Sequence, residues 1–464
     1  MRSVLRESSF YPARSARTLL GLLLAGLLLQ AGCARYQALP LNDHPQWPSS
    51  FAHISVNRAS MPFPQLASHR FDPSDGLDMT EVAMLAVSNN PDLRLARDDA
   101  GIGRAQAFAA GLLPDPQLSV SRDLPASSIP GLVSAYSISP GYDLQSLLLH
   151  GSGYEAAKAS SRQIDLNLLW QEWQVVSQAR VLFSRAISQD ELLGWLRQNQ
   201  QMLHEQYVRT KAASEAGNVT ADVANASLVA WQDISRQVND LQRQRLQTRH
   251  HLNTLLGLAP DTELPLRDSE QLTMPDRRAI DQALAELPQR RPDLLALQAG
   301  YHAQDARYRQ AILAQFPPLN LAYALARDTG GVVTHGLAIA MVVPLLNGNR
   351  GQIAVSKATR QRLHDEYENR VLAARAMVRT LQADSSLISA QLATVRSGLP
   401  QLDAVAKSAR QRLQNGDMDE AGFVPIETAR ISKHIEAVNL QQSLLEDRIA
   451  LLTLLGLDSA GAHP

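Results

Sequence analysis

The stretch NNPDLRLARDD, residues 89–99, has a counterpart later in the chain, RRPDLLALQAG at residues 290–300. In both, Pro-Asp-Leu opens a run of helix-forming residues. Proline suits the first position of a helix because its missing N–H would have no partner there. Asn90 precedes the first of these prolines and is a favourable capping residue. Pro91 and Pro292 lie 201 positions apart, which raises the possibility of a duplication.

Further pairs of motifs recur at almost the same separation. Lys158-Ala159 matches Lys357-Ala358, Gly217 matches Gly416, and LLGL at 255–258 returns at 454–457, each 199 positions later. Four anchors at nearly one offset indicate two copies of one structural unit. The expected organisation is repeat 1 at 77–258, a connector at 259–275, repeat 2 at 276–457 and a C-terminal tail at 458–464.

Each repeat has the same expected order of elements. The Pro-Asp-Leu helix runs to about Leu113 in repeat 1 and to Phe316 in repeat 2, where prolines stop it. Alternating apolar and polar residues then predict a strand pair. The expected strands are 116–124 and 135–145 in repeat 1, and 318–327 and 336–346 in repeat 2. Their length suits tilted strands of a membrane barrel.

A long helical hairpin follows each strand pair. Glycine-containing turns at 150–153 and 347–351 are expected to open helices at 154–216 and 353–415. In the first of these, apolar residues recur every seven positions, as in a coiled coil. Tips near Gly217 and Gly416 then reverse the chain into return helices that end at LLGL. Because Pro425 lies early in the second return helix, that helix is expected to begin later than its counterpart.

The N-terminus has the composition of an export signal. Basic residues precede the apolar run at 19–29, and QAGC follows, so 1–32 is expected to be a lipoprotein-type signal peptide with Cys33 as the lipid attachment site. Gln30 stands where an aliphatic residue is usual, and a plain signal peptide with an incidental cysteine is the alternative. Residues 33–76 are expected to form an extended tether, and Cys33 is the only cysteine, so no intrachain disulfide is expected.

Composition argues against several function classes. The chain has 464 residues, 45% hydrophobic and 19% charged, with a net charge of −1, which disfavours a nucleic-acid binder. No apolar stretch after the signal is long enough for a transmembrane helix. Histidines at 44, 53, 69 and the adjacent pair 250–251 are irregularly placed, so no metal site is expected. The glycines at 101–103 do not form a dinucleotide-binding motif, and no catalytic motif or cofactor is expected.

Geometry constrains the assembly. Four strands per chain are too few to close a membrane barrel, which needs about eight. An open sheet edge is not viable in lipid, so the chains must oligomerise if these are membrane strands. Two chains would supply eight strands and three would supply twelve.

The doubled order of helix, strand pair, long hairpin and LLGL resembles the TolC-like outer-membrane efflux proteins, and Cys33 resembles their lipoprotein branch. The resemblance implies a mainly α fold with a membrane β-barrel portion: a homotrimer with a 12-stranded barrel in the outer membrane, continued by an α-helical periplasmic barrel. It also implies an exit duct of a tripartite efflux pump, exporting drugs or metal ions received from a periplasmic adaptor and an inner-membrane transporter.

In that family the hairpin tips close the periplasmic mouth, and acidic residues line the constriction. The corresponding gate candidates here are Asp222, Asn225, Asp417, Asp419, Glu420 and Glu427. Gly217 and Gly416 are the candidates for the tip turns and for adaptor docking. The alternative for the acidic residues is a set of solvated surface charges. The alternative for the whole protein is a soluble or lipid-anchored periplasmic coiled-coil scaffold without a channel.

Overall fold

The computed structural model describes residues 36–44, 46–48, 56–58, 61, 63–126, 130–268, 272 and 275–457. The chain divides into two units, Met1–Gln46 and Trp47–Pro464, and all described helices and strands belong to the second. In the first unit, residues 36–44 and 46 include no helix or strand. The expected signal peptide, Cys33 and the tail at 458–464 lie outside the described residues.

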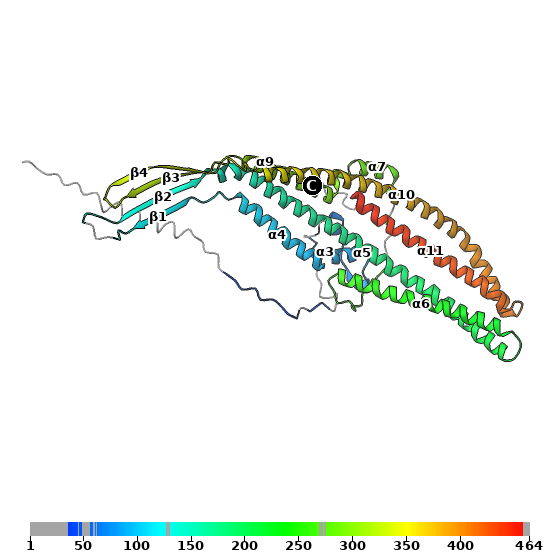
Figure 1. Ribbon diagram of the computed structural model, residues 1–464. Helices are drawn as coiled ribbons and strands as arrows, with labels where there is room; N and C mark the ends of the chain where they lie inside the picture. Colours follow the sequence, from blue (N-terminus) through cyan, green and yellow to red (C-terminus); the bar gives the residue numbers. More distant parts are fainter. Residues whose placement is uncertain are drawn as a thin grey trace, which may run out of the picture. The chain divides into compact units, whose positions relative to one another are not determined.

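The two repeats follow one order of elements (Figure 1). Repeat 1 contains α3 (Met79–Asn89), α4 (Pro91–Gly111), β1 (Gln117–Asp123), β2 (Ala135–Asp143), α5 (Leu144–Glu215) and α6 (Ala221–Leu255). Repeat 2 contains α7 (Arg277–Ala285), α8 (Leu287–Arg290), α9 (Pro292–Leu313), β3 (Leu319–Arg327), β4 (Val333–Met341), α10 (Arg350–Asn415) and α11 (Glu420–Leu455). Two short helices, α2 (Pro64–Ser68) and η3 (Pro73–Asp75), precede repeat 1.

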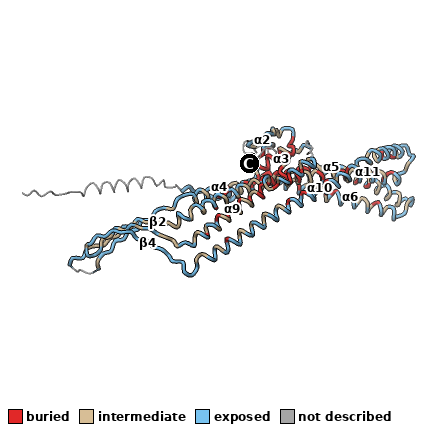
Figure 2. Tube along the Cα trace, turned by 90° about the horizontal axis from the view of Figure 1, so that it is seen from above, coloured by how far each residue is buried: buried red, intermediate tan, exposed pale blue. Residues whose placement is uncertain are grey.

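The strands form one antiparallel sheet in the order β1-β2-β3-β4. The central pairing, β2 with β3, joins the two repeats, with Tyr136 opposite Arg327 and Asp143 opposite Asn320. Within the second unit, the sheet lies at one end and the hairpin tips at the other (Figures 1 and 2). Among the described residues, no helix has both the length and the apolar character that crossing a bilayer requires.

Helix α5 is continuous over 72 residues, about 108 Å at 1.5 Å per residue. It packs against α4, α6, α9 and α11. The sevenfold pattern is its buried seam, with Leu182, Leu196 and Leu203 all less than 10% exposed. Gln189, which interrupts the pattern, is also buried.

Two expected helix starts are wrong. Helix α5 begins at Leu144 rather than 154, so the glycines at 151 and 153 lie inside it. Asp143 caps this early start by accepting the N–H of Gln145 at 2.9 Å. Helix α10 begins at Arg350 rather than 353, after a true turn in which Asn349 has φ 55°. A glycine inside a helix costs only about 1 kcal/mol, which the packing of α5 against its neighbours outweighs.

The start of α11 and the tether also differ from expectation. Helix α11 begins at Glu420, the position equivalent to the first residue of α6, with Pro425 inside it. Asp419 caps it by accepting the N–H of Gly422 at 2.9 Å, and Pro425 removes only one hydrogen bond. The expected extended tether instead contains α2 and η3, and its Phe63 and Leu66 are buried.

The LLGL motifs pack beside the starts of the two Pro-Asp-Leu helices, α4 and α9. Gly257 has φ +69°, and a Cβ there would lie 2.5 Å from the carbonyl oxygen of Asn89. The Asn90 amide donates to the Leu255 carbonyl at 3.0 Å, while its oxygen accepts the N–H of Leu93 at 2.9 Å. The end of repeat 1 is therefore fixed to the beginning of its own Pro-Asp-Leu helix.

Repeat 2 closes in the same place by different contacts. Gly456 has φ +65°, and a Cβ there would lie 2.9 Å from the Trp173 ring and 3.7 Å from Cβ of Arg290. Arg291 forms a buried two-bond pair with Asp293, at 2.9 and 2.7 Å, and lies 4.8 Å from the Trp170 ring centre. The two tryptophans belong to α5, so repeat 2 is anchored on repeat 1. Buried residues concentrate in this region (Figure 2).

Gly257→Ala should lower the free energy of unfolding by about 2 kcal/mol or more, because it combines a left-handed backbone with a contact to the Asn89 carbonyl. The measurement is thermal unfolding of the detergent-solubilised protein, followed by circular dichroism. Gly194→Ala is the matched control: it lies within α5 with no atom within 4 Å of the new Cβ, and should stabilise slightly. Equal melting temperatures for the two variants would contradict the proposed closure.

Candidate functional site

The sheet has two chemically different faces. Because directly paired residues share a face and residues alternate along a strand, the register assigns every side chain. One face carries small or polar residues, including Ser119, Ser121, Ser137, Ser139, Asn320, Ala322, Ala324, Ala338 and Ala340. The other carries large apolar residues, which are exposed: Leu118, Val120, Ile138, Leu321, Tyr323, Leu325, Leu337, Ile339 and Met341. This arrangement suits a wall between lipid and water.

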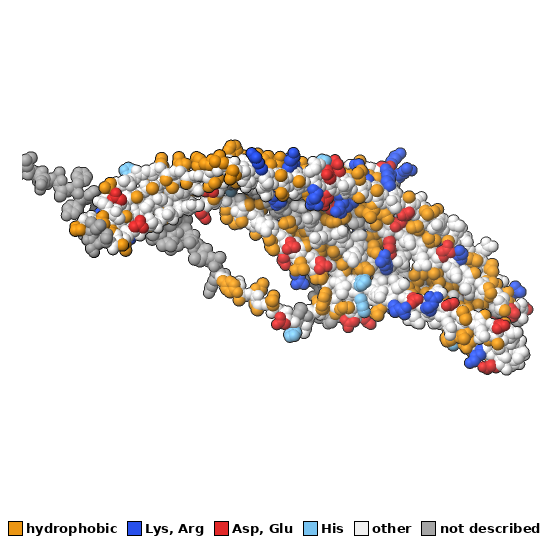
Figure 3. All heavy atoms as spheres, in the orientation of Figure 1, with side chains coloured by type: hydrophobic (Ala, Val, Ile, Leu, Met, Phe, Trp, Pro, Cys, Tyr) orange, Lys and Arg blue, Asp and Glu red, His pale blue; other side chains and the backbone are white. Residues whose placement is uncertain are grey.

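The sheet is open at both sides. Strands β1 and β4 are its edges, and within the described residues neither pairs with a further strand. Figure 3 shows apolar side chains along the sheet end of the molecule. Unpaired strand edges next to an exposed apolar face call for partner strands.

The hairpin tips turn on glycine. Gly217 has φ +75° and Gly416 has φ +83°, and neither has an atom within 4 Å of a built Cβ. After each glycine the next N–H bonds back to the preceding helix: Asn218 to the Ala213 carbonyl and Asp417 to the Arg412 carbonyl, both at 2.8 Å. Glycine is thus needed here for its backbone conformation.

The acidic candidates divide into two groups. Asp222, Asn225 and Asp417 are exposed near the reversals. Asp419 is occupied as the cap of α11, and Glu420 forms an ion pair with Arg209 of α5 at 2.5 Å. Asp222 and Asp417 form no ion pair with any described residue, and so remain available to ions or to a partner.

Glu427 is not an exposed lining residue, so the expectation for it is wrong. It is 2% exposed and accepts hydrogen bonds from Arg410 at 2.8 Å, Arg430 at 2.8 and 3.0 Å, and Gln198 at 3.1 Å. Burial raises the pKa of Glu427, but hydrogen bonds and charge from Arg430 and Arg410 outweigh it, so the pKa lies below its ordinary value.

Glu427 belongs to a cluster that joins the two hairpins, which we name the cross-hairpin network. Its members are Trp195 and Gln198 of α5, Asp403 and Arg410 of α10, and Glu427, Arg430 and His434 of α11. The His434 ring stacks on Trp195 at 4.4 Å, and its Nε2 lies 3.0 Å from Asp403. The hydrogen bond with His434, supported by Arg430, lowers the pKa of Asp403.

Two simpler ion pairs join the same hairpins on either side of this network. Arg185 of α5 makes two 2.8 Å bonds to Glu446 of α11, and Arg209 pairs with Glu420 nearer the tips. Sequence reasoning missed these links because the partners lie more than 200 positions apart. The one local signal was Glu427 with Arg430, three positions apart on a helix face.

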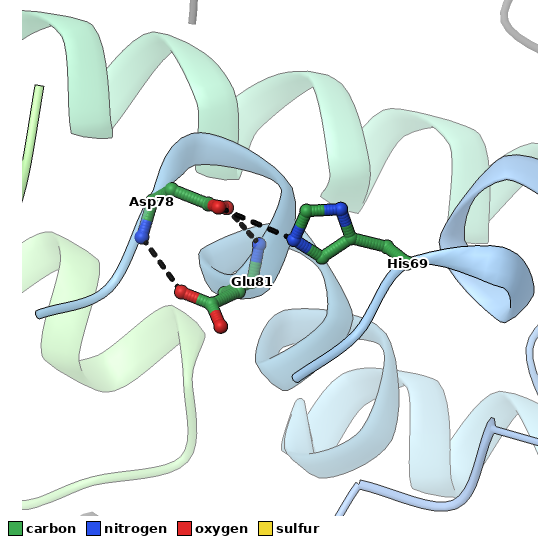
Figure 4. Close-up of side chains that lie close together, drawn as sticks. All are labelled: His69, Asp78 and Glu81. Atoms are coloured by element: carbon green, nitrogen blue, oxygen red, sulfur yellow. Dashed lines mark hydrogen bonds and ion pairs between the residues drawn. The ribbon is translucent and has the colours of Figure 1, made fainter. Parts of the chain in front are cut away.

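His69, Asp78 and Glu81 lie together at the start of α3 (Figure 4). Glu81 accepts the backbone N–H groups of Asp72 at 2.6 Å and Asp78 at 3.0 Å, while Asp78 accepts the N–H of Glu81 at 2.8 Å. His69 Nε2 lies 3.2 Å from the other Asp78 oxygen. This is a capping box completed by a histidine, and its carboxylates are engaged in holding the helix start.

Comparison with known proteins bears on the family. Residues 282–457 match the family model described as outer membrane efflux protein. This match extends from within α7 to the end of the second LLGL motif and so covers most of the second repeat. No curated protein matches the chain. The resemblance to the TolC-like outer-membrane efflux family is thereby confirmed over residues 282–457, and the structural comparisons extend the shared fold to both repeats.

Three solved structures illustrate the shared fold. The outer-membrane channel OprN has 19% identity and a TM-score of 0.68, covering 85% of this chain and 95% of its own. The CmeC outer-membrane channel of Campylobacter jejuni has 14% identity and a TM-score of 0.68, covering 92% and 94%. The open-state MtrE outer-membrane channel of Neisseria gonorrhoeae has 17% identity and a TM-score of 0.66, covering 91% and 97%. The matched residues thus lie within a chain that shares the fold of these solved structures over 85–92% of its length.

Glu427→Gln should lower the free energy of unfolding at neutral pH by roughly 2 kcal/mol, because Arg410 and Arg430 lose the buried, charged acceptor that they share. Since the folded-state pKa of Glu427 is lowered, its stabilisation is present above the ordinary value of 4.5 and is lost as the pH falls through the folded-state value. The stability of the variant should therefore fall less steeply below pH 4.5. The measurement is urea unfolding of the detergent-solubilised protein at several pH values.

The exposed Asp417→Asn is the matched control for this experiment, because it removes one carboxylate near the same tips without breaking an ion pair. The free energy of unfolding of Asp417→Asn should depend on pH in the same way as that of the wild type. If the free energy of unfolding of Glu427→Gln fell with decreasing pH as steeply as that of the wild type, the role assigned to this carboxylate would be refuted.

Proposed function

We propose that this protein is the outer-membrane exit duct of a tripartite efflux system. The observation that carries the proposal is the open four-stranded sheet, apolar on one face and small or polar on the other, joined directly to long helical hairpins. The match of residues 282–457 to the outer membrane efflux protein family and the fold shared with solved outer-membrane channels support it. A soluble scaffold would instead expose the apolar sheet face and its unpaired edges to water.

Three copies would close the wall. The β1 edge of one chain would pair with the β4 edge of the next, giving a 12-stranded barrel with no unpaired edge. The apolar faces would meet lipid and the small or polar faces would line the water-filled interior. The long hairpins would continue the wall as a helical tube of roughly 100 Å into the periplasm.

The proposed partners are those that the resemblance to the TolC-like efflux proteins implies. A periplasmic adaptor would dock at the hairpin tips, where Gly217 and Gly416 leave the backbone accessible, and an inner-membrane transporter would deliver drugs or metal ions. Acylation of Cys33 would add a lipid anchor to the outer membrane. A duct of this kind requires no catalytic group and no cofactor, since its work is to open and to close.

The gate is proposed to lie at the tips, with Asp222, Asn225, Asp417, Asp419 and Glu420 as its polar residues. Asp222 and Asp417 are the carboxylates that carry selectivity in this proposal, because Asp419 is a helix cap and Glu420 is paired with Arg209. Rings of like carboxylates attract cations and repel anions.

The proposed function is tested by membrane fractionation and electrophoresis. The protein should require detergent for extraction, migrate as a trimer that dissociates on heating, and conduct ions in planar lipid bilayers. Extraction as a soluble monomer without conductance would favour the coiled-coil scaffold.

Asp222→Asn combined with Asp417→Asn should lower the cation-over-anion permeability ratio in bilayers, because the proposed constriction loses its uncompensated carboxylates. The matched control is Glu191→Gln combined with Glu263→Gln, which removes the same charge at exposed positions away from the tips. The control should keep the wild-type ratio. An unchanged ratio in the tip variant would place the selectivity elsewhere.

A further inference from the structure

The apolar face of the sheet carries charged residues at the end where the β1–β2 and β3–β4 loops lie. The last rung of this face before the β1–β2 and β3–β4 loops pairs Arg122 with Tyr136, Tyr136 with Arg327, and Arg327 with Val333. By register these side chains lie on the apolar face, in line with Val120 and the other exposed apolar residues. We name Arg122, Tyr136 and Arg327 the rim triad. It lies beside the β1–β2 and β3–β4 loops, and this end of the sheet points away from the helices (Figure 1).

Two arginines on a lipid-facing surface need an explanation. An arginine that faces lipid is strongly unfavourable at the bilayer midplane and costs little near the interface. Their place on the last rung therefore puts the rim triad at the boundary between hydrocarbon and headgroups, where Tyr136 also fits. In the proposed duct the helices are periplasmic, so this boundary is that of the outer leaflet.

Among the described residues, none supplies a counter-charge to the rim triad. Neither arginine forms an ion pair with a described residue, and Nε of Arg327 is buried without a hydrogen-bond partner. Asp123 lies on the opposite face by register, and the Asp328 carboxylate accepts the N–H of Val332 at 2.9 Å. Residues 127–129, outside the described part of this loop, are Ser, Ser and Ile and carry no charge.

We infer that the rim triad binds the phosphorylated headgroup of an outer-leaflet glycolipid, an inference that rests on the proposed function. Arg122 and Arg327 are two strands apart, about 10 Å, with the tyrosine between them. Guanidinium groups bind phosphate oxygens through two parallel hydrogen bonds, which a sugar phosphate at this depth would satisfy. The acyl chains of the same lipid would cover the apolar residues one rung below, Val120 and Leu325.

The experiment is a lipid titration of the detergent-solubilised oligomer, followed by native mass spectrometry. The probes are a diphosphorylated glycolipid, the same lipid after enzymatic dephosphorylation, and phosphatidylglycerol. The wild type should bind the phosphorylated glycolipid in preference to both others. Arg122→Gln with Arg327→Gln should weaken that binding about 25-fold, from about fivefold for each arginine near a charged lipid surface.

Two matched variants separate charge at the rim from charge in general. Arg122→Lys with Arg327→Lys keeps the charge and should retain most of the binding. Arg236→Gln with Arg243→Gln removes two exposed positive charges from α6 and should leave binding unchanged. Equal binding of the dephosphorylated lipid or of phosphatidylglycerol by the wild type would overturn the inference, whatever the variants do.

Failure of this inference is distinguishable from failure of the proposed function. The glutamine double variant should remain a heat-sensitive trimer with wild-type conductance, since it alters only the outer surface of the wall. A wild type that conducts but does not prefer the phosphorylated glycolipid refutes the lipid site alone. A wild type that neither forms trimers nor conducts refutes the duct, and the lipid site with it.

Discussion

Six residue pairs between β2 and β3, from Tyr136 with Arg327 to Asp143 with Asn320, join the two repeats into one sheet. Because neighbouring strands are antiparallel, β2 and β4 run in the same direction and each leads to a long helix at the same end of the sheet. The two hairpins are therefore placed side by side by the ladder itself. The same ladder fixes which residues face outward, because a slip of one residue would exchange the apolar and polar faces.

Below the sheet, each repeat must also be closed, and the two copies have diverged in how this is done. Asn90 caps its helix and binds the Leu255 carbonyl, whereas Arg291 at the equivalent position is paired with Asp293 and stacked on Trp170. A neutral cap suffices where a repeat closes on itself. An arginine can reach further, and here it attaches the second repeat to α5 of the first. The duplicated Pro-Asp-Leu thus marks equivalent backbone positions, but the side chains that precede it, Asn90 and Arg291, make different contacts.

The sequence allowed the repeat order, the strand pairs and the tips to be predicted, because alternation, proline and positive-φ glycine are local signals. It could not predict the start of α5, where glycines tolerated by packing were interpreted as a turn, nor the start of α11, where Pro425 suggested a later beginning. The burial of Glu427 could not be predicted for a related reason. Its surroundings come from Gln198 and Arg410, on helices that no local pattern places beside it.

The links between the hairpins differ in how readily they separate. Arg185 with Glu446 and Arg209 with Glu420 are partly exposed, and such pairs contribute at most about 1 kcal/mol and are screened by salt. The Glu427 carboxylate is buried, so separating the helices there would leave several charged groups without partners at once. Movement of the tips is therefore least costly beyond the cross-hairpin network, where Arg209 with Glu420 is the remaining described ion pair between α5 and α11. In a duct that opens at its tips, this network would act as the fixed end of the moving segment.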